Sequence, residues 1–194
     1  KPIGPVYGEA EARRLAAERG WHVGRDGRHF RRLVPSPQPL RILELDVIEM
    51  LVNQGVIVIC AGGGGIPVIC RVDRSLAGVE AVIDKDLASS LLARELKADV
   101  LLMLTDVDAV YAHWGKPEAR RLRRLRPQAL QEFSFAPGSM GPKVAAACEF
   151  VEQSGGIAGI GRLGDCRAIL AGEAGTLVTR DATDTLWWEQ NPGA

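Results

Sequence analysis

The sequence predicts an α/β fold built in layers around a largely parallel sheet. Segments with apolar residues at helical spacing alternate with short apolar runs rich in β-branched residues. The 194 residues, 46% of them apolar, are enough for one domain with its own core or for a large piece of one. Helices that alternate with apolar strands typically cover the faces of a parallel sheet.

Charge and composition argue against several classes of protein. Lys+Arg and Asp+Glu number 24 each, so no net charge favours nucleic acid or an anionic membrane as a partner. The sequence contains no apolar run of the length that a membrane span needs. The four cysteines show no C-x-x-C spacing, which predicts reduced thiols in a cytoplasmic protein. The chain opens at Lys1 without a signal-peptide pattern, and we expect it to be a fragment of a longer polypeptide.

The first half of the chain is predicted to begin with a helix over 9–19, which ends at Gly20 in a left-handed cap. The segment that follows, rich in glycine, proline and charge, predicts strands or loops in an exposed excursion. Apolar residues from Leu40 to Leu51 then recur at helical spacing, and Gly55 ends this second helix. The run GVIVIC over 55–60 predicts a buried strand, and a glycine run and the short apolar stretch IPVIC come next.

The second half of the chain continues the alternation of helices and strands. A helix is expected over 87–96, a strand over 100–105 and a further helix from about 142 to 153, and the runs IAGI and TLVT predict the last strands. The run RRLRRLR over 120–126 holds five arginines in seven residues. We interpret it as a solvated loop rather than an RNA-binding patch, because the net charge is zero and no aromatic residues interleave the arginines.

The glycine run after GVIVIC comprises Gly62, Gly63, Gly64 and Gly65. Glycines at the end of a strand can turn with positive φ and leave their N–H groups facing a ligand, as phosphate cradles do. A flexible turn explains such a run equally well.

Two lysines stand in the first turn of predicted helices, where the helix dipole makes a cation unfavourable. Lys85 lies between Asp84 and Asp86, and Lys143 follows Pro142. The aspartates have a sufficient structural role as helix caps, and either lysine alone would be interpreted as a solvated surface residue. Two such lysines beside a glycine cradle indicate a polyphosphate ligand and phosphoryl transfer, which needs fixed positive charge around the transferred group. The sequence has no GxxxxGK[ST] motif, so a P-loop is excluded.

A metal site is not expected from the histidines, because His22, His29 and His113 share no ligand spacing. Asp106 and Asp108 could ligate a metal or hold a turn at the end of a strand. We expect Mg²⁺ to be bound mainly through the phosphates of the ligand.

Six segments resemble, in this order and spacing, the carbamate kinases of the amino-acid kinase family. They are KPIGPVY, RRLVPSP, CAGGGGIPV, GVEAVIDKD, LTDVDAVY and FAPGSMGPKV, and the resemblance extends to about Arg180. It implies a three-layer αβα sandwich with a mainly parallel open sheet, of which the N-terminal part is absent, and a homodimer. It also implies reversible phosphoryl transfer between carbamoyl phosphate and MgADP, giving ATP and carbamate. We expect residues 1–194 alone to be inactive.

The resemblance also implies roles for individual residues. Lys85, Lys143 and Lys1 match catalytic lysines, and Asp86 orients them. The glycine run over 62–65 would bind phosphate and carbamate. The residues expected to bind the nucleotide are Thr105, Asp106, Tyr111, Gly138, Ser139, Met140 and Lys143.

Three parts of the chain are expected from the same comparison of motifs. Residues 1–39 would form a protruding, lid-like subdomain, residues 40–180 the nucleotide-binding part of the kinase domain, and residues 181–194 a tail of unknown role. Two alternatives to a carbamate kinase remain open. One is another family member that acts on a carboxylate or on UMP, against which KPIGP and RRLVPSP argue, and the other is a truncated, non-catalytic nucleotide-binding chain.

Overall fold

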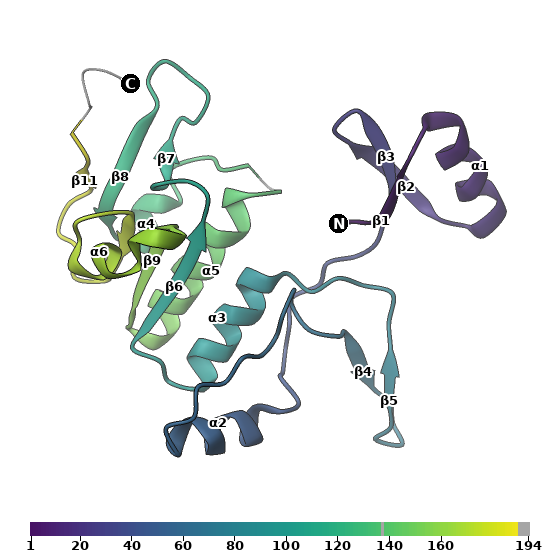
Figure 1. Ribbon diagram of the computed structural model, residues 1–194, viewed down its shortest axis with the longest axis horizontal. Helices are drawn as coiled ribbons and strands as arrows, with labels where there is room; N and C mark the ends of the chain where they lie inside the picture. The colour runs from purple at the N-terminus through teal and green to yellow at the C-terminus, as the bar shows by residue number, and fades with distance from the viewer. Residues whose placement is uncertain (137, 190–194) are drawn as a thin grey trace. The chain divides into compact units, whose positions relative to one another are not determined.

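The computed structural model describes residues 1–136 and 138–189, and its contacts divide the chain into two compact units (Figure 1). The first unit comprises residues 1–38 and 63–84, and the second comprises residues 39–62 together with the chain from residue 85 onward. The predicted three-part division at residues 39 and 180 stays a prediction for the whole protein.

The first unit contains a three-stranded antiparallel sheet in the order β1-β3-β2. Its elements are β1 (Pro2–Tyr7), α1 (Glu9–Arg19), β2 (His22–Asp26) and β3 (His29–Leu33). The predicted helix over 9–19 is confirmed, and Gly20 ends it with a φ of 66°, a left-handed conformation that glycine adopts without strain. A separate antiparallel hairpin of β4 (Val68–Cys70) and β5 (Leu76–Gly78) completes this unit.

The second unit is built on a mixed, mainly parallel sheet in the order β11-β8-β10-β9-β6, with β7 paired to β8. The longest pairing, β6 with β9, is parallel over six residue pairs. The strands are β6 (Val100–Thr105), β7 (Tyr111–Ala112), β8 (Arg120–Leu125), β9 (Ile157–Arg162), β10 (Thr176–Val178) and β11 (Leu186–Trp187). The predicted strand over 100–105 is confirmed.

Helices cover both faces of this sheet. On one face α5 packs against α3 and β9, and Phe150 and Val151 of α5 share a core with Ala158 and Ile160. On the other face Ile169 lies against Gly159 and Gly161, which leave room for it. The helices of this unit are α2 (Leu45–Asn53), α3 (Lys85–Glu95), α4 (Pro127–Leu130), α5 (Met140–Ser154) and α6 (Cys166–Ala171), with a 3-10 turn at Leu163–Asp165. The α/β layered fold is therefore confirmed.

The predicted loop over 120–126 is wrong, because most of the run forms strand β8. Leu122 and Leu125 are fully buried, and their burial fixes the backbone of the arginine run in the sheet. The strand pairs with β10 on one side and β11 on the other. Two leucines in the core thus outweigh the charge of the neighbouring arginines in deciding the local structure.

The predicted buried strand over 55–60 is also wrong. Ile57 and Ile59 are 93% and 97% exposed, and the segment runs in an irregular conformation. The physical reason is pairing: within the described residues the sheet ends at β6, and no strand pairs with this segment. The preceding helix begins at Leu45 rather than near residue 40, and ends close to Gly55, which has a φ of 76°.

Part of the tail over 181–194 is ordered against the sheet as β11, and residues 190–194 lie outside the described residues. All four cysteines are free thiols in the structure. A search of the described helices finds none with the length and apolar character needed to cross a membrane.

Candidate active site

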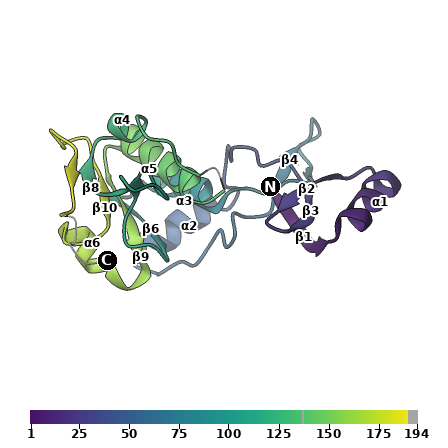
Figure 2. The ribbon, with the colours of Figure 1, turned by 90° about the horizontal axis from the view of Figure 1, so that it is seen from above.

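The topology of the second unit gathers two helix starts and two strand ends at one end of the sheet. Helix α3 runs directly into β6 and α5 runs into β9, and the two strands are parallel neighbours (Figures 1 and 2). Because each helix runs antiparallel to the strand that follows it, the N-terminus of the helix lies near the carboxyl end of that strand. Ligands in open α/β sheets bind at the carboxyl ends of the strands, where helix N-termini supply N–H groups and positive partial charge.

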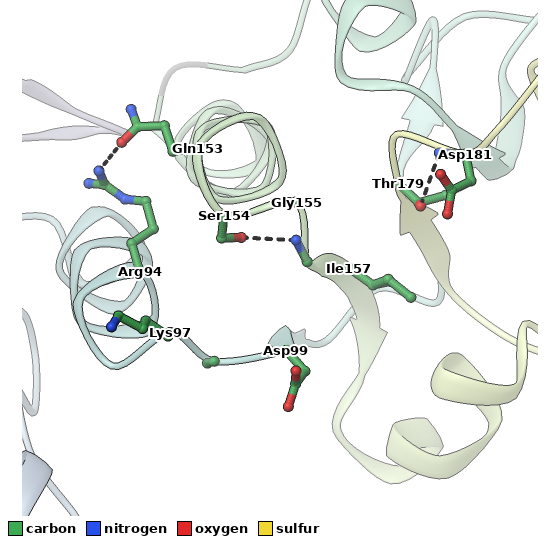
Figure 3. A pocket seen from close by; sticks show the side chains of 11 residues that line it. Arg94, Lys97, Asp99, Gln153, Ser154, Gly155, Ile157, Thr179 and Asp181 are labelled. Atoms are coloured by element: carbon green, nitrogen blue, oxygen red, sulfur yellow. Dashed lines mark hydrogen bonds between the residues drawn. The ribbon is translucent and has the colours of Figure 1, made fainter.

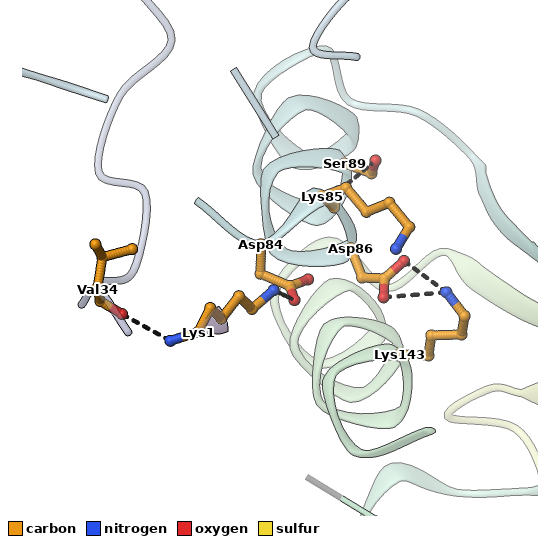
Figure 4. Close-up of polar contacts among 7 residues, drawn as sticks. All are labelled: Lys1, Val34, Asp84, Lys85, Asp86, Ser89 and Lys143. Carbon is orange, nitrogen blue, oxygen red and sulfur yellow. Dashed lines mark hydrogen bonds and ion pairs between the residues drawn. The ribbon is translucent and has the colours of Figure 1, made fainter. Parts of the chain in front are cut away.

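An ion pair joins these two helix starts (Figure 4). The Nζ of Lys143 donates to Oδ1 of Asp86 at 2.9 Å and to Oδ2 at 3.1 Å. The two side chains are only 11% and 9% exposed, so the pair is largely shielded from water. Asp86 lies in the first turn of α3, where its charge suits the helix dipole, and it holds the ammonium of α5 in a fixed place.

Lys85 is the first residue of α3, and its side chain is exposed. Its carbonyl accepts a hydrogen bond of 2.8 Å from the Ser89 hydroxyl, a bond within the first turn. Both predicted lysines therefore occupy the first turn of a helix, as the sequence indicated. The ammonium of Lys85 and the N-termini of α3 and α5 thus bring positive charge and N–H donors to this end of the sheet, which are the groups that an anion site uses.

In the first unit, the Nζ of Lys1 forms an ion pair with the nearly buried carboxylate of Asp84 (Figure 4). The backbone of Lys1 is held by Val34, whose N–H donates to the Lys1 carbonyl at 2.9 Å. The sequence offered only a capping role for Asp84, and this partner in the KPIGP motif was missed because the two residues lie 83 positions apart.

The glycine run has the backbone expected of a tight turn at three of its four positions. Gly62, Gly64 and Gly65 have φ values of 49°, 132° and 89°. Gly63 does not have a positive φ, and a Cβ added there would meet nothing within 4 Å. The conformational need for glycine is therefore at residues 62, 64 and 65.

Thr105 and Asp106 lie at the carboxyl end of β6, as predicted, and the Thr105 hydroxyl donates to Asp106 at 3.0 Å. The predicted residues Gly138, Ser139 and Met140 lie at the start of α5, which begins at Met140. The backbone N–H of Ser139 donates to Ala136 at 3.2 Å. Pro137, inside the predicted turn, falls outside the described residues.

Tyr111 belongs to a three-residue network that sequence reasoning missed. Its hydroxyl donates to Oδ1 of Asp108 at 3.0 Å, and Nη1 of Arg121 donates to Oδ2 at 3.1 Å. Partial burial of Asp108 opposes ionisation, but the bonds from Tyr111 and Arg121 outweigh it, and the pKa of the carboxyl is lowered. Burial, and then the bond to Asp108, raises the pKa of the Tyr111 phenol. The phenol therefore stays protonated and donates at neutral pH.

A cavity of about 550 Å³ lies at the opposite end of the sheet (Figure 3). Its lining includes Arg94, Lys97, Asp99 and Asp181, near the start of β6 and β9. It contains none of the residues predicted for the site. In the part of the chain that the structure describes, no group of three or more His, Cys, Asp or Glu side chains could hold a metal ion.

The fold agrees with the comparisons with known proteins. A model of the amino acid kinase family matches residues 10–160, more than half of the chain, and the chain belongs to this family. Within it, the chain is 48% identical over 194 residues to a carbamate kinase of Rhizobium meliloti, and 52% identical over 180 residues to one of Haemophilus influenzae. These alignments cover 99% and 93% of this chain, and 60% and 58% of the relatives.

A solved structure of a carbamate kinase is also similar to this chain. The carbamate kinase of Giardia lamblia bound to AMP-PNP is 43% identical, with a TM-score of 0.83, over 93% of this chain and 59% of that chain. The amino-acid kinase fold is thereby confirmed. The chain spans about three-fifths of the length of the curated relatives that it matches.

Proposed function

We propose that the protein carrying this chain transfers phosphate reversibly between carbamoyl phosphate and MgADP, giving ATP and carbamate. The observation that carries this proposal is the placement of Lys85 and Lys143 in the first turns of two packed helices, with Asp86 bound to Lys143. The similarity to carbamate kinases supports the choice of substrates within the family.

In this reaction an oxygen of the ADP β-phosphate attacks the phosphorus of carbamoyl phosphate. The bond from phosphorus to the carbamoyl oxygen breaks, and carbamate leaves with the bonding electrons. Such a transfer needs fixed cations and hydrogen-bond donors more than a covalent nucleophile. We assign this role to the ammonium groups of Lys85 and Lys143, with Asp86 as the residue that positions Lys143.

Lys1 and the glycine run over 62–65 are proposed ligands of the transferred phosphate and of carbamate. Their support is the match of KPIGP and CAGGGGIPV to the family motifs, together with the positive φ at Gly62, Gly64 and Gly65. For the nucleotide we propose Thr105, Asp106 and Tyr111, together with the start of α5. Mg²⁺ would enter on the phosphates of the nucleotide, and we propose a homodimer as the assembly of the whole protein.

Two other functions can be separated from this one by assay of the whole protein. A family member that acts on a carboxylate or on UMP would transfer phosphate from ATP to that acceptor and would make no ATP from carbamoyl phosphate. A non-catalytic chain would bind MgADP without turnover of any of these substrates.

The decisive experiment is Lys85→Met in the whole protein, with Lys97→Met just past the other end of the same helix as the control. We expect Lys85→Met to lower kcat by about 10²-fold or more with little change in affinity for the nucleotide, because one preorganised donor to the transition state is lost. Lys97→Met should leave kcat unchanged. Turnover near the wild-type rate in Lys85→Met would remove this lysine from the mechanism.

A further inference from the structure

Residues 186–189, here termed the tail segment, are bound to the arginine-rich strand β8. Trp187 pairs with Leu122, and the backbone N–H of Trp188 donates to the Arg121 carbonyl at 3.1 Å. The indole Nε1 of Trp188 donates to the Gly175 carbonyl at 2.8 Å. The tail segment therefore has its own backbone and side-chain partners in the second unit.

Stacking against arginine side chains adds to this attachment. The guanidinium of Arg120 lies 4.4 Å from the centroid of the Trp187 ring, and that of Arg123 lies 4.7 Å from the Trp188 ring. Trp187 also packs edge-to-face on Phe133 at 5.9 Å. Arg–Trp stacking is among the more favourable cation–π contacts, so the tail segment has a definite place on the sheet.

One guanidinium connects this segment to the residues proposed to bind the nucleotide. Nη2 of Arg121 donates to the Glu189 carbonyl at 3.1 Å, and its Nη1 donates to Asp108 at 3.1 Å. Asp108 in turn accepts the hydroxyl of Tyr111. The chain of contacts thus runs from Glu189 through Arg121 and Asp108 to Tyr111.

We propose that the tail segment is a positioning element of the nucleotide site. The Glu189 carbonyl accepts one N–H group of Arg121 and so holds the guanidinium in the orientation in which it donates to Asp108. Asp108 in turn holds the hydroxyl of Tyr111 in place. The inference rests on the proposed function in one respect, the contact of Tyr111 with the nucleotide. Without the tail segment Arg121 regains side-chain freedom, and ordering it again on binding weakens affinity.

The test compares two shortened forms of the whole protein, one ending after Thr185 and one ending after Glu189. We expect the form ending after Thr185 to bind MgADP about tenfold more weakly at 25 °C and to have a higher KM for MgADP. Its kcat and its KM for carbamoyl phosphate should stay within twofold of the values of the intact protein. The second keeps the tail segment and should bind like the intact protein. If the tail segment only stabilised the fold, its removal would lower the melting temperature and leave the affinity and KM for MgADP unchanged in the folded protein.

Hydrogen exchange of the peptide over 106–112 gives a measurement that needs no ligand. We expect faster exchange in the form ending after Thr185 and unchanged exchange in the form ending after Glu189. If the intact protein fails to bind MgADP, the proposed function is wrong, and the exchange rates still decide whether the tail segment positions this loop.

Arg121→Met keeps the test decisive if the shortened form is unstable. This variant should weaken MgADP binding to a similar degree, and removal of the tail segment from it should add little, because both changes break the same chain of contacts. Additive effects of the two changes, or unchanged affinity and exchange in a folded form ending after Thr185, would overturn the proposal.

Discussion

Asp86 and Lys143 have a role in stability as well as a proposed role in catalysis, because both side chains of the pair are largely buried. Asp86→Ala is expected to lower the free energy of unfolding by about 3 kcal/mol, since it leaves the ammonium of Lys143 without its carboxylate in a poorly solvated place. Urea unfolding of the whole protein measures this change.

The exposed ion pair of Arg14 and Glu18 on α1 is the control, with side chains 58% and 52% exposed. Glu18→Ala should change the free energy of unfolding by less than ~0.5 kcal/mol. Equal effects at Asp86 and Glu18 would show that the Asp86–Lys143 pair is well solvated.

Cys148 and Cys70 differ in environment, and we expect a corresponding difference in reactivity. Burial, and next the charge of Glu152, raises the pKa of the Cys148 thiol to about 12, whereas Cys70 is exposed. At pH 8 roughly 10⁻⁴ of Cys148 is thiolate, the form that reacts. Iodoacetamide followed by mass spectrometry should label Cys70 in the folded protein and leave Cys148 intact. Equal labelling of the two before urea is added would contradict this.

At the scale of elements, the junction of α5 and β9 depends on Gly156. A Cβ at this position would lie 2.6 Å from the Asp99 carbonyl oxygen and 2.9 Å from the Phe150 ring. Because this carbonyl accepts the backbone N–H of Ile157 at 3.0 Å and cannot move away cheaply, Gly156→Ala should lower the free energy of unfolding by about 1–3 kcal/mol. Gly164→Ala, where nothing lies within 4 Å, should be nearly neutral in the same thermal or urea unfolding.

The elements that sequence alone predicts well are those whose signals are local. Strand β6 is a continuous apolar run, and α3 and α5 start at Asp–Lys and Gly–Pro signals within two residues of the predicted positions. The segment over 55–60 has an equally apolar pattern. A strand also needs a neighbouring strand to pair with, and the local residue pattern does not show whether one is present. Strand β8 was missed because the burial of Leu122 and Leu125 depends on the rest of the sheet.

The same distinction applies to the candidate site. Lys85, Asp86 and Lys143 could be found from sequence because helix starts have recognisable signals. The link from Tyr111 through Asp108 to Arg121 could not, since it depends on the register in which β7 pairs with β8. The residue patterns of β7 and β8 do not indicate the register in which the two strands pair.

At the scale of the whole molecule, we predict that residues 1–194 alone bind MgADP at reduced affinity but do not make ATP from carbamoyl phosphate at a useful rate. The residues proposed for the nucleotide lie within the chain, whereas the family resemblance assigns further phosphate and carbamate ligands to segments outside it. Donors that act as a unit lose nearly all of their effect when several are missing. Calorimetry with MgADP beside a coupled assay of ATP formation tests both parts, and robust turnover would refute the second.

The placement of the arginine run in β8 has a consequence for proteolysis. Trypsin cleaves after arginine and needs an extended, unpaired segment in its active site, and a loop over 120–126 would be the first place to be cut. In the sheet the backbone over 120–125 is paired with β7, β10 and β11, so cleavage there requires the second unit to open. The rate of tryptic cleavage within this run therefore reports how often the sheet opens, and a bound nucleotide that stabilises the folded unit should slow it.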